Sequence, residues 1–329
     1  MLWIEQLLNG LQYSLMLFLF AAGLTLVFGI MNLVNLAHGS LYMLGAYAAA
    51  ALTAFSGSYV AGLFGALLFM AVFGAALEIL LIRRLYRQDH LTQVLATFAL
   101  ILIFNESVRI IWGVQPLPYD MPAALSGSVP ITGDLRYSAY RLALIVLGIV
   151  VALLLYWMVA RTRVGMWVRA GASNREMVQM MGVNVRWLFT AIFALGAAFS
   201  GLAGAALAPL MSVQVGMGEE VLILAFVVVV VGGVGSIRGA FIAALLVGMV
   251  DSLGRAWLPG ALGRVLPSQI ASDLGPALAS MSVYLLMIVV LAVRPLGLFA
   301  PGATSLFPKW MRLRRSPVLT RTTTGKVAS

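Results

Sequence analysis

An uncharged run of 72 residues constrains the fold of this chain most strongly. From Gln6 to Leu77 there is no Asp, Glu, Lys or Arg. A helix that crosses a membrane needs about 20 consecutive apolar residues, so this run alone has room for three such helices. No segment alternates apolar and polar residues as a barrel strand does. The membrane crossings are therefore predicted to be helices.

Apolar runs and helix breakers divide the chain into about nine predicted spans, with eight to ten as the range. The spans are 8–30, 38–55, 60–82, 91–111, 139–160, 187–211, 221–235, 238–254 and 277–293. This pattern predicts an all-α fold, a polytopic transmembrane helical bundle in which residues 1–300 form a single domain. No basic segment precedes the first span, which is expected to remain as a helix rather than to be cleaved.

The distribution of basic residues predicts the orientation in the membrane. Placing Arg161–Arg186 inside leaves 16 lysines and arginines on the inner side and 5 on the outer side. Because cytoplasmic loops carry the excess of positive charge, the N-terminus is predicted to be periplasmic and the C-terminus cytoplasmic. Residues 301–329 form a basic tail, expected to be disordered and suited to an anionic lipid surface. The net charge of +10 therefore reflects orientation, and no nucleic acid is expected as a partner.

The predicted cytoplasmic loop 161–186 contains a short helix. Ser173 and Glu176 have the spacing of a capping box, and Gly182 provides a left-handed stop. Three methionines lie at helical spacing on one side: Met177, Met180 and Met181. So short a helix is marginal in water by itself, so it must dock on something. Two hypotheses follow: it couples the bundle to a soluble motor protein, or it lies on lipid headgroups.

Polar residues or glycines interrupt two of the predicted spans. The first interruption contains Asn35, His38 and Gly39, and the second contains Gly232, Gly233, Gly235 and Ser236. One hypothesis is that these are broken or re-entrant helices near a translocation path. The alternative is that they are ordinary turns at the cytoplasmic face with close helix packing, where His38 bonds a backbone carbonyl.

Two proline-containing segments, 112–138 and 254–276, are predicted to be outer loops. Either they dock a soluble protein or they simply connect spans. At the end of the fourth span, Glu106 and Arg109 stand three residues apart and are predicted to neutralise each other.

The residues needed for catalysis or ATP hydrolysis are missing from the sequence. The two histidines are far apart, there is no cysteine, and no phosphate-binding loop occurs. No metal, cofactor or catalytic residue is expected in this chain. It also lacks a series of acidic or histidine residues within the spans, so a proton-coupled carrier is poorly supported. The energy for any transport is expected to come from a partner.

Several motifs in order are similar to those of a known family. They are Asn35–Gly39 with Met43–Tyr47, then Arg169-Ala170, Met181–Asn184 and Gly201–Gly204, then Gly232–Ala240, and finally Arg294–Phe299. Together they resemble the branched-chain amino acid ABC-transporter permease family. The resemblance extends over about residues 10 to 300, and the basic tail lies outside it.

The resemblance implies a permease subunit in the inner membrane of a bacterial cell. Its expected partners are a second related permease, two cytoplasmic ATPases that bind ATP and Mg, and a periplasmic substrate-binding protein. The resemblance also implies that the ATPase docks on loop 161–186, with Arg169 and Ala170 among the coupling residues. The expected solute is a branched-chain amino acid. Relatives that carry urea or short amides leave these as an alternative, because a pore wall of Ala, Gly, Leu and Met without fixed charge suits any small net-neutral solute. A self-sufficient channel, a secondary carrier and a membrane scaffold are further alternatives.

Overall fold

The computed structural model describes residues 2–299 except 32, 133–134, 174 and 265–266, so the predicted tail 301–329 lies outside the described residues. The longer helices are α1 (Leu2–Met31), α2 (His38–Ser56), α3 (Tyr59–Leu77), α5 (His90–Trp112), α6 (Ala139–Arg161), α9 (Val185–Leu207), α10 (Met217–Gly232), α11 (Ile237–Leu262) and α12 (Ser268–Val293). The shorter ones are the π-helix η1 (Glu78–Ile82), α4 (Arg83–Leu85), the 3-10 helix η2 (Ala123–Leu125), α7 (Arg163–Ser173) and α8 (Arg175–Met180).

The prediction of a helical transmembrane bundle is confirmed. Within the described residues, seven helices are long and apolar enough to cross a membrane. Each of the nine predicted spans corresponds to one of the longer helices, but α2 and α10 are not among the seven. Helix α10 has only 16 residues, which is about 24 Å of helix and short for a full crossing.

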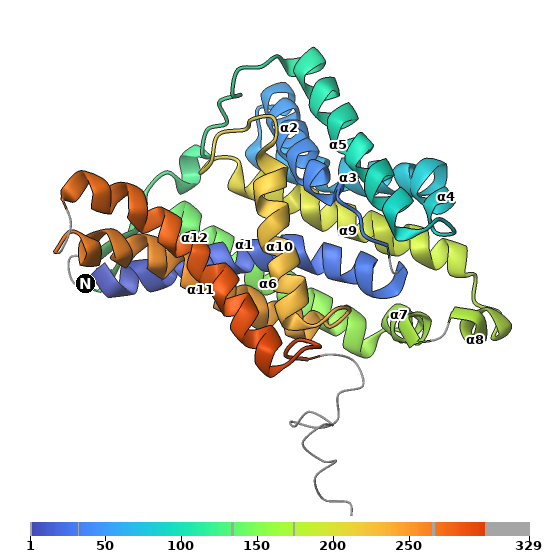
Figure 1. Cartoon of the computed structure of the whole chain (residues 1–329). Helices are drawn as coiled ribbons and strands as arrows, with labels where there is room; N and C mark the ends of the chain where they lie inside the picture. Colours follow the sequence, from blue (N-terminus) through green and yellow to red (C-terminus); the bar gives the residue numbers. More distant parts are fainter. Residues whose placement is uncertain (1, 32, 133–134, 174, 265–266, 300–329) are drawn as a thin grey trace, which may run out of the picture.

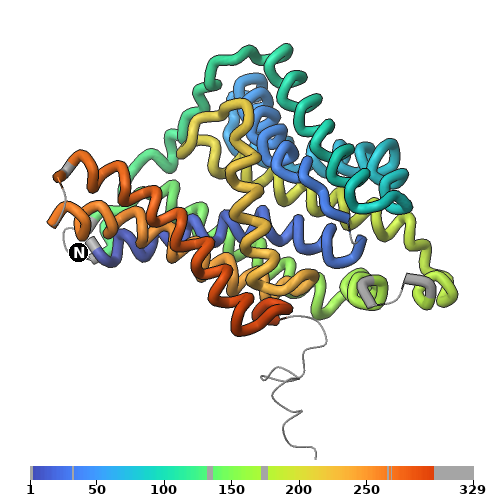
Figure 2. The backbone as a smooth tube through the Cα atoms, viewed as in Figure 1, coloured from blue at the N-terminus to red at the C-terminus, as the bar shows by residue number. Residues whose placement is uncertain are grey.

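Helix α1 runs through the middle of the molecule (Figure 1). It packs against α9 and α11, and α2 and α3 pack on the far side of α9. In its most apolar stretch 89% of the residues are buried, compared with 11% in the corresponding stretch of α12. The tube in Figure 2 shows α12 at the periphery, beside α11. Peripheral helices expose large apolar side chains, which is the surface that lipid covers in a membrane protein.

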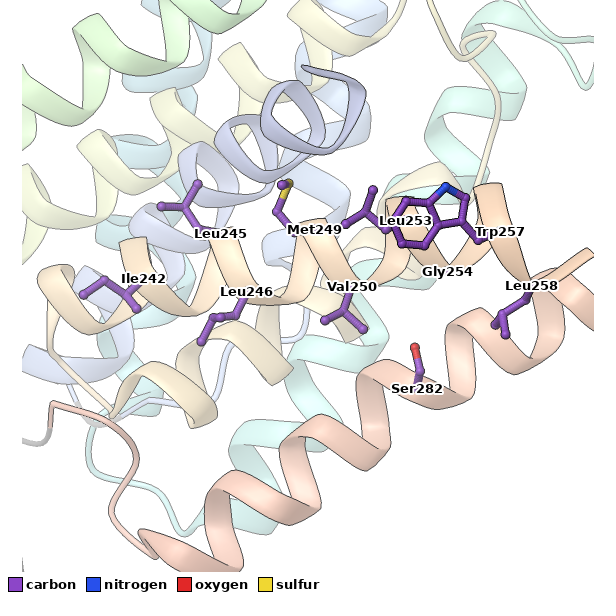
Figure 3. A pocket seen from close by; sticks show the side chains of 10 residues that line it. All are labelled: Ile242, Leu245, Leu246, Met249, Val250, Leu253, Gly254, Trp257, Leu258 and Ser282. Atoms are coloured by element: carbon purple, nitrogen blue, oxygen red, sulfur yellow. The ribbon is translucent and has the colours of Figure 1, made fainter. Parts of the chain in front are cut away.

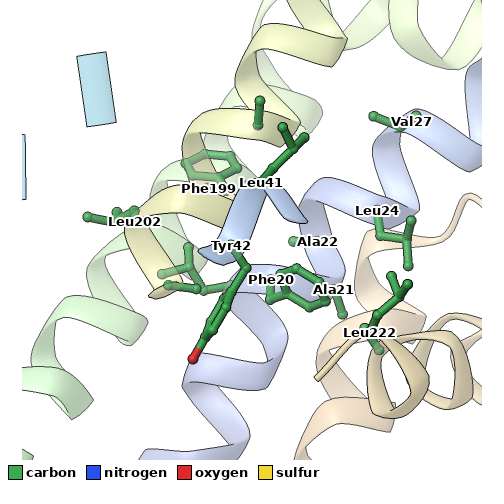
Figure 4. Packing of buried hydrophobic residues seen from close by; sticks show 14 of the residues in the cluster. Phe20, Ala21, Ala22, Leu24, Val27, Leu41, Tyr42, Phe199, Leu202 and Leu222 are labelled. Atoms are coloured by element: carbon green, nitrogen blue, oxygen red, sulfur yellow. The ribbon is translucent and has the colours of Figure 1, made fainter. Parts of the chain in front are cut away.

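Aromatic and small residues fill the centre of the bundle. Figure 4 shows Phe20 of α1, Tyr42 of α2 and Leu222 of α10 in one apolar cluster. The Phe20 and Tyr42 rings meet edge to face with centroids 5.6 Å apart. Helices α2 and α9 approach at backbone distance, because a Cβ on Gly45 would collide with the backbone of Gly201. Small residues at such crossings are typical of helix packing in membranes.

The two predicted outer loops contain regular structure. In the first loop, strands β1 (Ser128–Thr132) and β2 (Leu135–Ser138) pair as an antiparallel hairpin, a small departure from an all-α fold. The prediction of a loop over 254–276 is wrong for most of its length, because α11 continues to Leu262 and α12 begins at Ser268.

The packing of α11 against α12 explains why prolines do not end these helices. Pro259 and Pro276 lie inside the helices. A Cβ on Gly275 would lie 2.5 Å from the Pro259 ring, and a Cβ on Gly254 would lie 3.0 Å from Ala279. This close contact offsets the backbone hydrogen bond that each proline removes.

Candidate functional site

Helix α8 ends in a Schellman motif, as the glycine at position 182 predicts. The Gly182 amide donates to the Gln179 carbonyl over 3.0 Å and the Val183 amide donates to the Val178 carbonyl over 3.3 Å. Gly182 has φ +80°, a left-handed conformation in which its missing side chain avoids strain. The predicted short helix with a glycine stop is therefore confirmed.

The methionine side of α8 faces away from the bundle. The exposed fractions of Met177, Met180 and Met181 are 57%, 83% and 76%, whereas Val178 is 3% exposed. Ser173 ends α7 and Glu176 lies in α8, but the side-chain bonds of the predicted capping box lie outside the described residues. Helix α8 therefore contacts the bundle through Val178 and leaves its methionine side exposed.

Helix α7 precedes α8 and was not foreseen from the sequence. It contains Arg169 and Ala170, two of the predicted coupling residues. The Arg169 guanidinium donates to the Val159 carbonyl near the end of α6, and Ala170 packs against the core. The predicted coupling segment, residues 163–180, therefore consists of two consecutive helices that pack against α6, α9 and the C-terminal end of α1.

The second predicted glycine segment forms a tight turn between α10 and α11. Gly233 and Gly235 have φ +97° and +79°, and the Ser236 hydroxyl caps α11 by accepting from the Gly239 amide over 3.1 Å. A Cβ on Gly232 would lie 2.5 Å from the Gly239 carbonyl carbon. A Cβ on Gly235 would lie 3.2 Å from the Gly29 Cα of α1. This matches the alternative of a turn with close packing.

The segment that follows α12 packs onto this turn. The Leu298 amide donates to the Val231 carbonyl over 2.8 Å, and the Phe299 amide donates to the Gly232 carbonyl over 3.0 Å. These bonds satisfy carbonyls at the end of α10 that have no partner within their own helix. The glycine turn and the segment Arg294–Phe299, which lie far apart in the sequence, are therefore joined by backbone hydrogen bonds.

A cavity of about 540 Å³ joins the coupling helices to the glycine turn. Val168 and Arg169 of α7 line one side, and Gly235, Ser236 and Arg238 line the other. The Arg238 guanidinium donates to the Tyr156 hydroxyl over 3.3 Å and so links α11 to α6. Of the two predicted sets of site residues, Arg169 of the first and Gly235 and Ser236 of the second meet here.

The remaining predicted residues, Asn35, His38 and Gly39, lie deep in the bundle. The His38 ring is 5.1 Å from the Phe20 ring, centroid to centroid. Phe20 is 11 residues from the end of α1, or about 16 Å along the helix. Helix α2 therefore begins midway along α1 rather than at its end. The non-helical backbone that leads to it is buried, with Asn35 accepting from the Ala37 amide over 3.1 Å.

The position of His38 contradicts an ordinary turn at the cytoplasmic face and favours a broken helix. The His38 carbonyl accepts from the Ser200 hydroxyl of α9 over 3.1 Å. A Cβ on Gly39 would lie 2.5 Å from the Gly218 carbonyl oxygen near the start of α10. Buried irregular backbone of this kind is tolerated in a membrane only where protein or water surrounds it.

A second cavity, of about 790 Å³, was not foreseen from the sequence. It lies toward the N-terminal end of α1 and the C-terminal end of α9. The charged side chains that line it are Arg141, Glu220, Asp251 and Arg255. Asp251 and Arg255 form an ion pair of 2.9 Å. The pore wall expected from the sequence had no fixed charge, so this cavity differs from that expectation. The spacing of Asp251 and Arg255, four residues apart inside an apolar run, is the sequence signal that indicates it.

Glu78 is a further buried acid whose environment the sequence did not reveal. It is 0% exposed at the start of the π-helix η1. Its carboxylate accepts from Arg83 over 2.8 Å, from the Thr190 hydroxyl of α9 over 2.7 Å and from the Tyr86 hydroxyl over 3.0 Å. The predicted pair of Glu106 and Arg109 also forms, with 2.9 Å between the charged atoms, but both side chains are exposed.

A third hollow, of about 670 Å³, is almost entirely apolar. Figure 3 shows Leu246, Val250 and Trp257 of α11 and Ser282 of α12 around it. It offers no charged group to a polar solute. Among the described residues, no group of three or more His, Cys, Asp or Glu side chains is placed to hold a metal ion.

Comparisons with known proteins find relatives among transport permeases. The permease protein BraD of a high-affinity branched-chain amino acid transport system in Pseudomonas aeruginosa is 26% identical over 308 residues, which cover 90% of this chain and 95% of BraD. The corresponding LivH proteins of Salmonella typhimurium and Escherichia coli are 26% and 25% identical over 276 residues, 78% of this chain and 87% of each relative. No solved structure matches the chain.

A family model also matches most of the chain. The model described as branched-chain amino acid transport system, permease component, covers residues 6–291. That stretch runs from the first turns of α1 almost to the end of α12 and includes helices α7 and α8, the glycine turn and the lining of the 790 Å³ cavity. This chain therefore belongs to the family of permease components of branched-chain amino acid transport systems.

Proposed function

We propose that this chain is a permease subunit of an ATP-binding-cassette importer for leucine, isoleucine and valine in the bacterial inner membrane. The family match over residues 6–291 carries the proposal. The names of the relatives support the substrate class. Residues 1–300 then form one permease domain with nine helices that enter or cross the membrane, and residues 301–329 form a basic tail. The N-terminus is periplasmic and the C-terminus is cytoplasmic.

The proposed complex has four kinds of component. This chain pairs with a second related permease, and two cytoplasmic ATPases bind ATP and Mg. A periplasmic binding protein delivers the solute. No cofactor is assigned to this chain itself, and the lipid membrane is its remaining partner.

Helix α8 is the proposed docking point for the ATPase. Its three exposed methionines suit a hydrophobic groove, because Met is flexible and adapts to irregular surfaces. Burial of each side chain stabilises the contact by roughly 1.5–3 kcal/mol at most. Closure of the ATPases pushes on α8 and α7. The side chains around the 540 Å³ cavity, where α7 and the glycine turn meet, pass that movement to α10 and α11. Access to the solute then alternates between the two faces.

Reconstitution in liposomes tests this proposal. The chain alone is expected to move neither labelled leucine nor labelled urea. Addition of the second permease, the ATPases and the binding protein is expected to give ATP-dependent leucine uptake. Uptake by the chain alone, driven by a proton or sodium gradient, would overturn the importer assignment in favour of a secondary carrier. ATP-dependent uptake of urea without leucine would assign the complex to urea instead.

A further inference from the structure

The 790 Å³ cavity has the properties of a solute site rather than of a packing defect. Its volume lies within the range of about 300–1,000 Å³ that is usual for small-molecule pockets. Polar and apolar side chains from α1, α6, α10, α11 and α12 converge on it. Asp251 is 4% exposed, but its charge is already compensated by Arg255. The remaining charged groups therefore decide what the cavity can bind.

Two opposite charges in the cavity have no charged partner among the described residues. Glu220 lies in the first turn of α10 and forms neither an ion pair nor a hydrogen bond within that part of the chain. Arg141 donates one bond of 2.8 Å to the Asn9 carboxamide oxygen, a neutral group, and forms no ion pair there. A solute with one ammonium and one carboxylate group would compensate both charges at once.

Gln12 adds an independent indication of a ligand. It is 4% exposed, lines the cavity and makes no hydrogen bond to any described residue. Because its carboxamide lines the cavity, it faces the cavity space, where it can bond water or a bound polar solute. Next to it, Met16 and Leu17 of α1 and Leu224 of α10 supply an apolar wall for an aliphatic side chain.

We propose that this cavity binds a zwitterionic aliphatic amino acid, with Glu220 contacting the ammonium group and Arg141 the carboxylate. The inference rests on the proposed function and adds to it a binding site within the permease itself. Ethanolamine phospholipids also combine an ammonium with an anion, so a lipid headgroup shares part of this chemistry. It lacks the short aliphatic side chain that Met16, Leu17 and Leu224 would contact.

The absence of cysteine from the chain allows a direct test that does not depend on transport. Ser252 lines the cavity, so Ser252→Cys places the only thiol of this subunit there. Membranes that contain the full-length variant are treated with a membrane-impermeant maleimide, and its reaction with this subunit is followed over time. We expect L-leucine to slow the reaction in a saturable way. Isocaproate, which lacks the ammonium group, and leucinamide, which lacks the carboxylate, are expected to protect at least about tenfold less well.

Variants in the same background assign the contacts. Glu220→Gln is expected to raise the leucine concentration for half protection about tenfold or more, and Arg141→Gln is expected to act likewise. Glu106→Gln makes the same chemical change as Glu220→Gln, but in an exposed pair outside the cavity. It is expected to leave the leucine concentration for half protection unchanged. An unaltered labelling rate without ligand shows that each variant is folded.

Three results would overturn the inference. They are labelling that leucine does not slow, protection that Glu220→Gln leaves intact, and protection by phosphoethanolamine equal to that by leucine, which would indicate a headgroup site. Because labelling requires no ATPase, loss of leucine uptake with intact protection would instead count against the proposed importer and leave the site in place.

Discussion

The charged cavity near Gln12 and the glycine turn near Gly29 lie at opposite ends of α1 and differ in packing and in charge. They are about 25 Å apart along the helix. At the turn, the backbones of α1, α10 and α11 meet with no room for a side chain. The cavity has about 790 Å³ of space and two charged side chains, Glu220 and Arg141, that form no ion pair among the described residues. Substitutions should therefore act through steric collision at the turn and through lost solute contacts at the cavity.

The largest effect is expected from a side chain added at the turn. Gly235→Leu forces a branched residue into φ +79°, with its Cβ 3.2 Å from the Gly29 Cα. A left-handed conformation alone is unfavourable by about 1–2 kcal/mol for such a residue, and the collision adds to this. We expect leucine uptake in the reconstituted importer to fall to less than about a tenth of normal. Gly260→Leu is the matched control, because a Cβ there meets nothing within 4 Å. Equal uptake by the two variants, at equal amounts of protein in the membrane, would show that steric collision at the turn does not limit transport.

A charge on the methionine side of α8 is expected to separate ATP hydrolysis from transport. Met181 is 76% exposed, so Met181→Glu does not disturb the bundle. In the docked complex the carboxylate would be buried without a partner, at a cost of several kcal/mol. Hydrolysis and uptake measured in the same proteoliposomes should show a fall in leucine moved per ATP. Met121→Glu, in the segment between α5 and α6, is expected to retain normal coupling. Normal coupling in Met181→Glu would refute docking at α8.

A smaller effect is expected for the two acid–arginine pairs outside the cavity. Glu78→Gln leaves a fully buried site with weaker bonds to Arg83, Thr190 and Tyr86. We expect it to lower the free energy of unfolding by about 1–3 kcal/mol, visible as a lower thermal midpoint in detergent. Glu106→Gln, in an exposed pair, is expected to cause no measurable shift. Equal shifts of the thermal midpoint in the two variants would show that the buried pair contributes no more to stability than the exposed pair.

Local patterns in the sequence predicted the elements that depend on neighbouring residues. The uncharged run predicted membrane helices, and Gly182 predicted the end of α8 because a left-handed stop is a local property. Likewise, the pairing of Glu106 with Arg109 follows from their spacing.

Features that depend on distant residues were not predictable in this way. Pro259 was expected to lie in an outer loop, yet it lies inside α11, where it packs closely against Gly275 of α12. The depth of His38 follows from its contacts with Phe20 and Ser200, which no local pattern reveals. The cavity brings Gln12 and Glu220 together from helices that are far apart in sequence. The roles of these residues in transport stay predictions.

In the proposed importer, ATP binding by the ATPases docked at α8 changes access to the cavity at the other end of the bundle. The most direct measurement is the maleimide reaction rate of Ser252→Cys in the assembled importer, with and without ATP and vanadate. We expect trapped nucleotide to change this rate several-fold and the additional substitution Met181→Glu to abolish the change. An identical rate with and without trapped nucleotide in the complex with intact Met181 would contradict it.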